Sequence, residues 1–170
     1  MRLAAVAALL IAAVTLVRRP PPVVNSAEAA IRRALRNGAR IELPAGVTEI
    51  QAEIEIPPGA TDIEIRGAPS GSTLRASNQF QGRAIFSCER TNRVRFANFS
   101  LDGNRLVLER RSGLPGFSTP FARFTIGNGI LAASAASLKI SNVRFANVPG
   151  FAILVSRSRD VSIDSVRVNP

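Results

Sequence analysis

The last forty residues of this chain repeat one pattern at a fixed spacing of 23 positions. In each pass, short segments alternate apolar with polar residues at every second position, which is typical of strands that bury one face. Strands this short cannot bury their inward side chains within one repeat, so successive repeats must stack on one another. The matching pairs are Ile130 and Ile153, Leu138 and Val161, Ile140 and Ile163, and Asn142 and Ser165.

The same pattern continues upstream with wider spacings. Phe96 lies 44 positions before Ile140, which is one repeat plus about 21 inserted residues. The insert is expected between Asp102 and Asn128.

One further repeat precedes these. Ile54 and Ile63 lie 31 positions before Ile85 and Val94. Together the repeats predict an all-β chain that forms a solenoid of parallel strands, with about four rungs of three short strands each.

A single amphipathic helix is expected before the first strand. Ser26 can cap its N-terminus, Glu28 lies in the first turn where it suits the helix dipole, and Gly38 ends it. A helix in this place can cover the open end of a stack of strands, which would otherwise expose unpaired backbone and apolar side chains.

The first 25 residues predict a targeting segment followed by a stiff linker. An apolar run from Leu3 to Val17 follows Met1 and Arg2, which is the length of the apolar part of a secretory signal, and 20–22 is a run of prolines. The chain is therefore expected to be secreted, periplasmic or at the cell surface, with residues 26–170 as its β-helical domain. The alternative is an uncleaved N-terminal anchor, the one case in which a membrane contact is expected.

Composition excludes several classes of site. The chain has no histidine, so it cannot contain a His-based catalytic triad or a His metal site. Its one cysteine, Cys88, cannot form an internal disulfide bond, and its neighbours predict a buried free thiol rather than a nucleophile.

The formal net charge is +10, and Lys139 is the only lysine. The arginines are mostly spread over predicted solvated strand faces, which is the simpler interpretation. The alternative is an anion-binding role, and only the insert concentrates arginines enough to suggest one. The candidate ligand-binding residues are Arg105, Arg110, Arg111 and Arg123.

The helix and the segments "GARIELPAG", "IEIPPGATDIEIRG", "NRVRFANFSLDGN" and "GFAILVSRSRDVSIDSV" resemble the N-terminal half of pectate-lyase-like, right-handed parallel β-helix proteins. The resemblance extends from about Ser26 to the end of the chain. In that family, the turn between the second and third strands of a rung commonly holds an asparagine that bonds along the stack. Asn98 and Asn142 match this position and Ser165 departs from it. Independently of the family, asparagine tolerates the left-handed backbone of a sharp bend, and stacked amides can bond from rung to rung.

The resemblance implies secreted enzymes that cleave or epimerise acidic polysaccharides, with a cleft on the outer face of the first strand of each rung. In this chain the first strands are expected at 83–87, 129–132 and 151–155, where no carboxylate occurs. Asp102, in "SLDGN", fits turn chemistry better than a catalytic acid. If the three isoleucines of these strands point inward, an apolar outward stripe is expected at Phe86, Leu131 and Leu154.

No catalytic residue and no cofactor is therefore predicted, and calcium is implied by the resemblance alone. The chain is expected to be the N-terminal part of a longer secreted protein that acts on or binds acidic polysaccharide, because no cap follows its last strand. In a polysaccharide-active protein, the insert would form one wall of the cleft. The alternative is a non-catalytic binding module or a truncated product. Binding to nucleic acid is suggested by charge alone, is opposed by the export segment, and is not predicted.

Overall fold

The computed structural model describes residues 25–112 and 125–169, with the backbone alone for 110–112. The predicted targeting segment and linker lie outside the described residues. Among the described residues, no helix has both the length and the apolar character needed to cross a bilayer.

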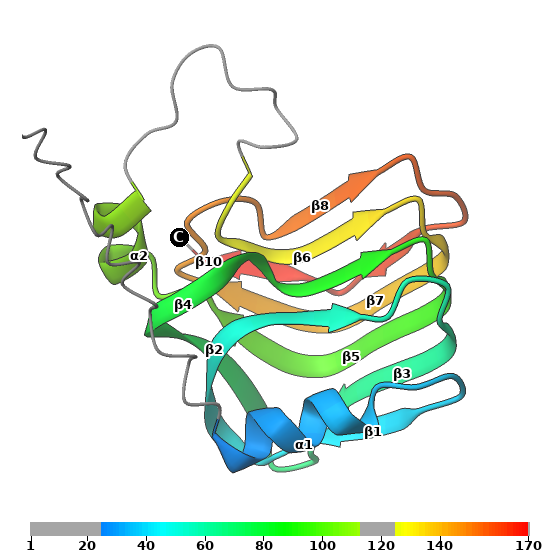
Figure 1. Cartoon of the computed structure of the whole chain (residues 1–170), viewed down its shortest axis with the longest axis horizontal. Coiled ribbons are helices and arrows are strands. Elements are labelled where there is room, and N and C mark those ends of the chain that lie inside the picture. The colour runs from blue at the N-terminus through cyan, green and yellow to red at the C-terminus, as the bar shows by residue number, and fades with distance from the viewer. Residues whose placement is uncertain (1–24, 113–124, 170) are drawn as a thin grey trace, which may run out of the picture.

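Two helices and ten strands make up the described chain (Figure 1). The helices are α1 (Ser26–Ala34) and α2 (Arg105–Ser112). The strands are β1 (Arg40–Leu43), β2 (Gly46–Ile56), β3 (Thr61–Gly67), β4 (Ser72–Glu89), β5 (Asn92–Asp102), β6 (Asn128–Ala133), β7 (Ala136–Ala146), β8 (Ile153–Ser156), β9 (Ser162–Asp164) and β10 (Arg167–Asn169).

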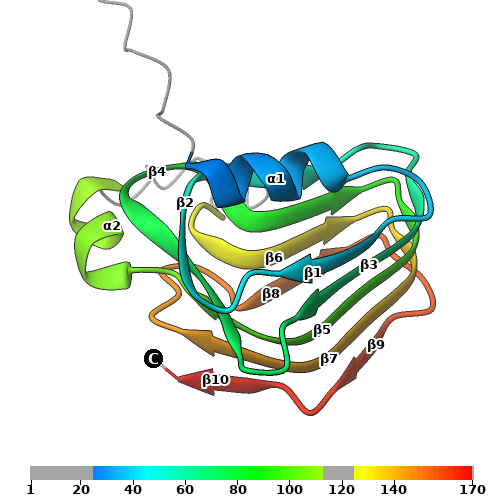
Figure 2. The same cartoon turned by 90° about the horizontal axis from the view of Figure 1, so that it is seen from below.

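All pairings between these strands are parallel, and they stack the strands in three columns. Column A consists of the ends of β2 and β4 followed by β6 and β8. Column B consists of β1, β3, the starts of β5 and β7, and β9. Column C consists of the starts of β2 and β4, the ends of β5 and β7, and β10. The long strands bend from one column into the next, as the views in Figures 1 and 2 show.

The register in column B confirms the predicted spacings. Ile63 pairs with Val94 at a spacing of 31, Phe96 with Ile140 at 44, and Ile140 with Ile163 at 23. The extra residues between β5 and β6 form α2 and the segment after it, where the insert was expected. The described chain is therefore mostly β with parallel pairing, which is compatible with the predicted all-β class.

The core lies between the three columns. Its largest buried side chains include Phe86, Phe96 and Phe99, whose ring centroids lie 5.2 to 6.3 Å apart in tilted and edge-on arrangements. Aromatic pairs at such distances add to the stabilisation that comes from burying their area. The inward side chains of one layer thus pack on those of the next.

The predicted register in column A is wrong by one residue. Ile54 pairs with Phe86 rather than with Ile85, and Phe86 pairs with Ile130. The register of β2 against β4 shifts twice between Ile50 and Ile54, so the spacing of 31 in column B becomes 32 in column A. Because positions 85 and 86 are both apolar, alternation alone could not choose between them.

The expected outward apolar stripe is wrong at Phe86 as a consequence. By contrast, Leu131 and Leu154 lie outside the core cluster, which contains Ile130 and against which Ile153 packs. Phe86 is in the core, Leu131 is buried, and Leu154 is half-buried.

The turns between columns B and C contain the predicted amide ladder. The side chain of Asn142 donates from Nδ2 to Oδ1 of Asn98 at 3.0 Å. Both residues have a positive φ, and so does Ser165, at 53°. Ser165 therefore differs from the asparagines in residue type but has the same left-handed backbone.

Helix α1 lies across the end of the stack that begins with β1 and β2, as was predicted (Figure 2). The side chain of Ile31, in this helix, is buried in the core. The N-cap is Asn25 rather than Ser26, because the Asn25 side chain accepts a hydrogen bond from the backbone N–H of Glu28 at 2.8 Å. The helix also ends at Ala34, and Gly38 lies in the turn that follows.

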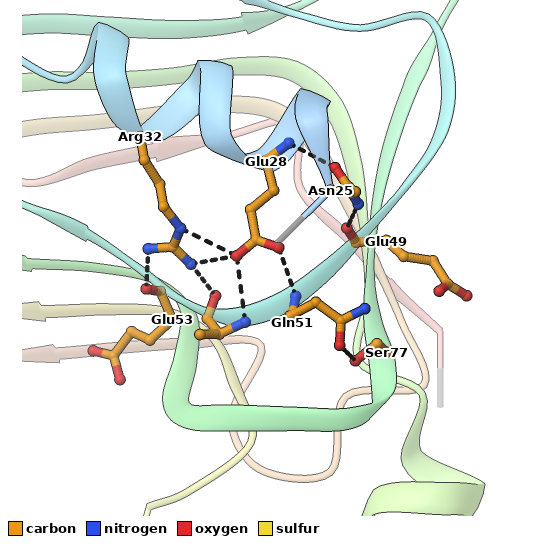
Figure 3. Close-up of polar contacts among 8 residues, drawn as sticks. Asn25, Glu28, Arg32, Glu49, Gln51, Glu53 and Ser77 are labelled. Atoms are coloured by element: carbon orange, nitrogen blue, oxygen red, sulfur yellow. Dashed lines mark hydrogen bonds and ion pairs between the residues drawn. The ribbon is translucent and has the colours of Figure 1, made fainter. Parts of the chain in front are cut away.

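A fully buried carboxylate attaches this helix to β2 (Figure 3). Glu28 accepts hydrogen bonds from the guanidinium of Arg32 and from the backbone N–H of Gln51 at 2.8 Å. Arg32 in turn donates to the backbone carbonyl of Glu53 at 2.7 Å. A buried charge is tolerated where it is paired and hydrogen-bonded, as it is here.

Candidate functional site

The turns from column A to column B repeat one backbone conformation in successive layers. Arg90, Ser134 and Arg157 occupy equivalent positions, 44 and 23 residues apart, and all have φ between 49° and 54°. Only a few per cent of non-glycine residues adopt this region. Its recurrence shows that the turn geometry is imposed by the stack rather than by the residue type.

These turns line a hollow of about 550 Å³, which we call the A/B pocket. It extends over three layers, and since parallel strands are spaced by about 4.8 Å, the first and third layers are separated by about 10 Å. Its lining residues are Arg90, Thr91, Asn92, Ser134, Ala135, Ala136, Arg157, Ser158 and Arg159.

The A/B pocket is strongly basic. Three arginines line it, Arg90, Arg157 and Arg159, and no aspartate or glutamate does. Among the described residues, Arg90 and Arg157 form no ion pair, and Arg159 has only a long contact of 3.9 Å with Asp160. The guanidinium groups are exposed and are therefore available to an anion.

Backbone hydrogen bonds hold the three turns at fixed distances. Ala136 donates to the carbonyl of Thr91 at 2.9 Å, and Arg159 donates to that of Ala135 at 3.0 Å. The hydroxyl of Ser158 accepts from the backbone N–H of Ala135 at 3.0 Å. A ligand would thus meet a lining that is already ordered, which lowers the entropy cost of binding.

The outer face of column A contains a group of charges that sequence reasoning missed. Arg83 contacts Glu89 at 2.7 Å and Glu53 at 3.6 Å through the same nitrogen. The two carboxylate oxygens therefore lie no more than 6.3 Å apart, the sum of those distances. The three predicted strands contain no carboxylate within their predicted bounds, but β4 extends to Glu89, and β2, which was not among the predicted three, adds Glu53.

This group joins β2 to β4. Glu53 also accepts a hydrogen bond from the backbone N–H of Arg83 at 2.7 Å. The hydrogen bond to Glu89 is the main cause that raises the pKa of Arg83, with the charges of Glu53, Glu89 and Glu55 adding to it. Since the guanidinium occupies the space between the two carboxylates, the arrangement is one of mutual neutralisation rather than of a free acid and a free base.

Asp102 is the last residue of β5, and its side chain bonds to the turn that follows, as expected. Its carboxylate accepts hydrogen bonds from the backbone N–H of Asn104 at 3.0 Å and from the side chain of Asn147 at 3.2 Å. Its other oxygen lies 3.6 Å from Arg75. A bond from Asp to the backbone two residues later is typical turn chemistry.

Of the predicted arginines of the insert, Arg105 alone has a described side chain. Arg105, in α2, pairs with Glu109 at 2.8 Å, and this hydrogen bond raises its pKa. The side chains of Arg110 and Arg111 and the whole of Arg123 lie outside the described residues. Anion binding by the insert therefore stays a prediction.

Cys88 is buried in column A, as predicted. Burial raises the pKa of its thiol to about 12, the reverse of what a nucleophilic thiolate needs. Among the described residues, no three His, Cys, Asp or Glu side chains are grouped so that they could hold a metal ion.

The arginines of the A/B pocket were not singled out from the sequence, although a signal for them existed. The spacings of 44 and 23 that align the apolar residues also align Arg90, Ser134 and Arg157. Applying those spacings to the turns as well as to the strands would have brought these residues together.

No protein-family model and no curated protein matches this sequence. A solved structure described as a "putative glycosyl hydrolase", from Parabacteroides merdae ATCC 43184, is similar in fold, with a TM-score of 0.60 and 17% identity. The similarity covers 78% of this chain and 60% of that one. At this identity the likeness concerns the fold alone, and the chain spans less than two thirds of the protein it matches.

Proposed function

We propose that this chain forms a right-handed parallel β-helix that binds acidic polysaccharide at the A/B pocket. The stacked columns, the fixed spacings of 23, 31 and 44, and the amide ladder support the β-helix. The resemblance to pectate-lyase-like proteins and the glycosyl-hydrolase description of the structural neighbour support the carbohydrate context.

One observation carries the proposal: three exposed arginines line one ordered hollow that contains no carboxylate. A guanidinium presents a planar fork of donors that matches a carboxylate in bidentate geometry. Arg90 and Arg157, which stand in layers about 10 Å apart, would bind separate carboxylates of a polyuronide. The polar groups of Asn92 and Ser134 would meet its hydroxyls.

The role proposed for the described residues is binding without catalysis. The acids of column A are neutralised by Arg83, and Asp102 is committed to a turn. In a longer protein this chain would supply the scaffold and a binding surface. Export is part of the same proposal, because its polymeric ligand lies outside the cell.

The test compares polygalacturonate with the same polymer fully methyl-esterified, using affinity electrophoresis of the whole chain. The ester removes the charge and keeps the sugar backbone. We expect retention by the acidic polymer alone, and a drop of about tenfold in affinity, or about 1.4 kcal/mol, when Arg90 and Arg157 are both replaced by alanine.

The matched control replaces Arg33 and Arg36 by alanine, which removes the same charge from exposed positions in and after α1. Equal retention by both polymers, or an equal loss in the two double variants, would contradict the proposal. Stronger retention by DNA, falling steeply with salt, would favour a nucleic-acid ligand instead.

A further inference from the structure

A second hollow, of about 450 Å³, lies at the corner between columns B and C, and we call it the B/C pocket. One wall is the turn 68–71 between β3 and β4, and the other is the amide ladder of Asn98 and Asn142. It shares no lining residue with the A/B pocket, and neither the sequence analysis nor the proposed function assigns it a role.

Two unpaired arginines line the B/C pocket. Arg66 comes from β3 and Arg144 from β7, and no aspartate or glutamate lines the hollow. Arg66 has Glu42 as its register partner in β1, but among the described residues no ion pair involves Arg66 or Arg144.

Other arginines on the same columns behave differently. Arg40 and Arg95 both contact Glu64, and Arg93 forms a two-pronged pair with Asp62. Arg66 and Arg144 differ from these arginines because no described carboxylate forms an ion pair with them.

The ladder adds neutral donors between these charges. Asn98 uses its carbonyl oxygen to accept from Asn142, and the described residues provide no partner for its Nδ2 group. Guanidinium groups beside an amide donor form a set of donors without a competing acceptor charge. Such a set suits an oxyanion.

The wall opposite the ladder is held in place. The buried hydroxyl of Ser72 accepts from the backbone N–H of Ala68 at 2.9 Å and donates to the carbonyl of Leu43 at 3.1 Å. A Cβ at Gly67 would lie 2.0 Å from the carbonyl oxygen of Asn98, so only glycine allows this close approach. The pocket is therefore formed before any ligand arrives, which lowers the cost of binding.

We infer that the B/C pocket is a second, separate binding site that takes one sugar residue carrying an oxyanion, either a carboxylate or a sulfate. A volume of about 450 Å³ falls within the range of small-ligand sites. Arg66 and Arg144 bind the anionic group, and the amide of Asn98 donates to it or to a neighbouring hydroxyl. This site does not depend on the A/B pocket, because the two share no residue.

The test is a nuclear magnetic resonance titration of the whole ¹⁵N-labelled chain with galacturonate, galactose 6-sulfate and galactose. We expect saturable shifts of the Asn98 and Asn142 side-chain amides and of the Gly67 backbone amide. These shifts should appear with the two anionic sugars and be absent with galactose at equal concentration. A preference between the anionic sugars would tell which anion the site favours.

The variant that replaces Arg66 and Arg144 by glutamine should weaken the affinity at least tenfold. The Arg90→Ala and Arg157→Ala double variant should keep the response, which separates this inference from the proposed function. Both arginines of the B/C pocket are exposed, so folding should be retained, and far-UV circular dichroism checks this. Equal shifts with galactose, or an unchanged affinity in the glutamine variant, would overturn the inference.

Discussion

The two ends of the stack differ in what covers them. At the end that begins with β1, helix α1 packs against the strands, and Ile41 of column B is 6% exposed. At the other end β9 and β10 are exposed throughout, with Ile163 at 48% and Val168 at 58%. The same column of apolar side chains is thus buried at Ile41, next to α1, and half exposed at Ile163.

This difference shows that burial in a stack depends on the next layer and not on the repeat itself. Ile140 and Ile163 are register partners with the same sequence context, yet Ile140 is fully buried. A side chain that lacks a layer on one side contributes less hydrophobic stabilisation. Stability should therefore fall along the stack from the covered end to the exposed end.

The largest expected effects are at the covered end. Replacing Glu28 by alanine leaves the backbone N–H of Gln51 without its acceptor and Arg32 without its ion-pair partner. Because Arg32 is partly exposed and the N–H of Gln51 loses its acceptor, the free energy of unfolding should fall by about 2 to 3 kcal/mol. Urea denaturation followed by circular dichroism measures it.

Its matched control is Glu49→Ala, which removes the same charge from an exposed side chain that points away from the buried group (Figure 3). The control should change the free energy by less than about 0.5 kcal/mol. If the two variants were equally stable, α1 would not be held by Glu28.

The next comparison uses the first and last isoleucines of column B. Ile41→Ala should cost about 3 kcal/mol, as is typical of a buried isoleucine, whereas Ile163→Ala should cost less than about 1 kcal/mol because half of this side chain is already in solvent. The same denaturation experiment measures both. Equal costs would mean that the exposed end is covered in solution.

A smaller effect is expected at the cap of α1. Asn25→Ala removes the side chain that accepts from the N–H of Glu28, which should cost about 1 kcal/mol. Ser26→Ala should change stability by less than about 0.5 kcal/mol. If Ser26→Ala cost more stability than Asn25→Ala, Ser26 would be the N-cap after all.

The smallest expected effect is on the pH dependence of stability under acidic conditions. Asp62 and Arg93 link adjacent layers by two hydrogen bonds, and Arg93 holds the pKa of Asp62 below its ordinary value. This contribution is present at neutral pH and is lost as the pH falls through the lowered folded-state pKa. Asp62→Asn should therefore flatten the stability profile slightly below about pH 4.

The check for that pair is Arg93→Ala, measured by thermal unfolding across the same pH range. It should flatten the profile as Asp62→Asn does, and the double variant should add nothing further. Additive effects would show that the two groups act separately.

The sequence was sufficient for the parts of the fold that depend on repetition. The spacings predicted the strand register of column B and the position of the insert. These two predictions succeeded because inward positions must be apolar in every layer, so each repeat gives independent evidence of the same spacing.

The sequence was not sufficient where one residue decides or where turns carry the chemistry. The predicted register of column A was off by one residue because Ile85 and Phe86 are both apolar and either could be buried. The irregularity in β2 that decides between them cannot be recognised from the amino-acid composition of that strand. The A/B pocket was missed because its turns use Arg90 and Ser134 at left-handed positions where glycine or asparagine would have been the expected signal.

Hydrogen–deuterium exchange of the whole chain, followed by mass spectrometry, tests most directly the claim that the strands next to α1 are more stable than the exposed strands β9 and β10. Peptides that cover 40–43 and 61–67 should stay protected long after those that cover 162–169 have exchanged, since local opening needs less free energy in exposed strands such as β9 and β10. Equal or greater protection at 162–169 would contradict the account.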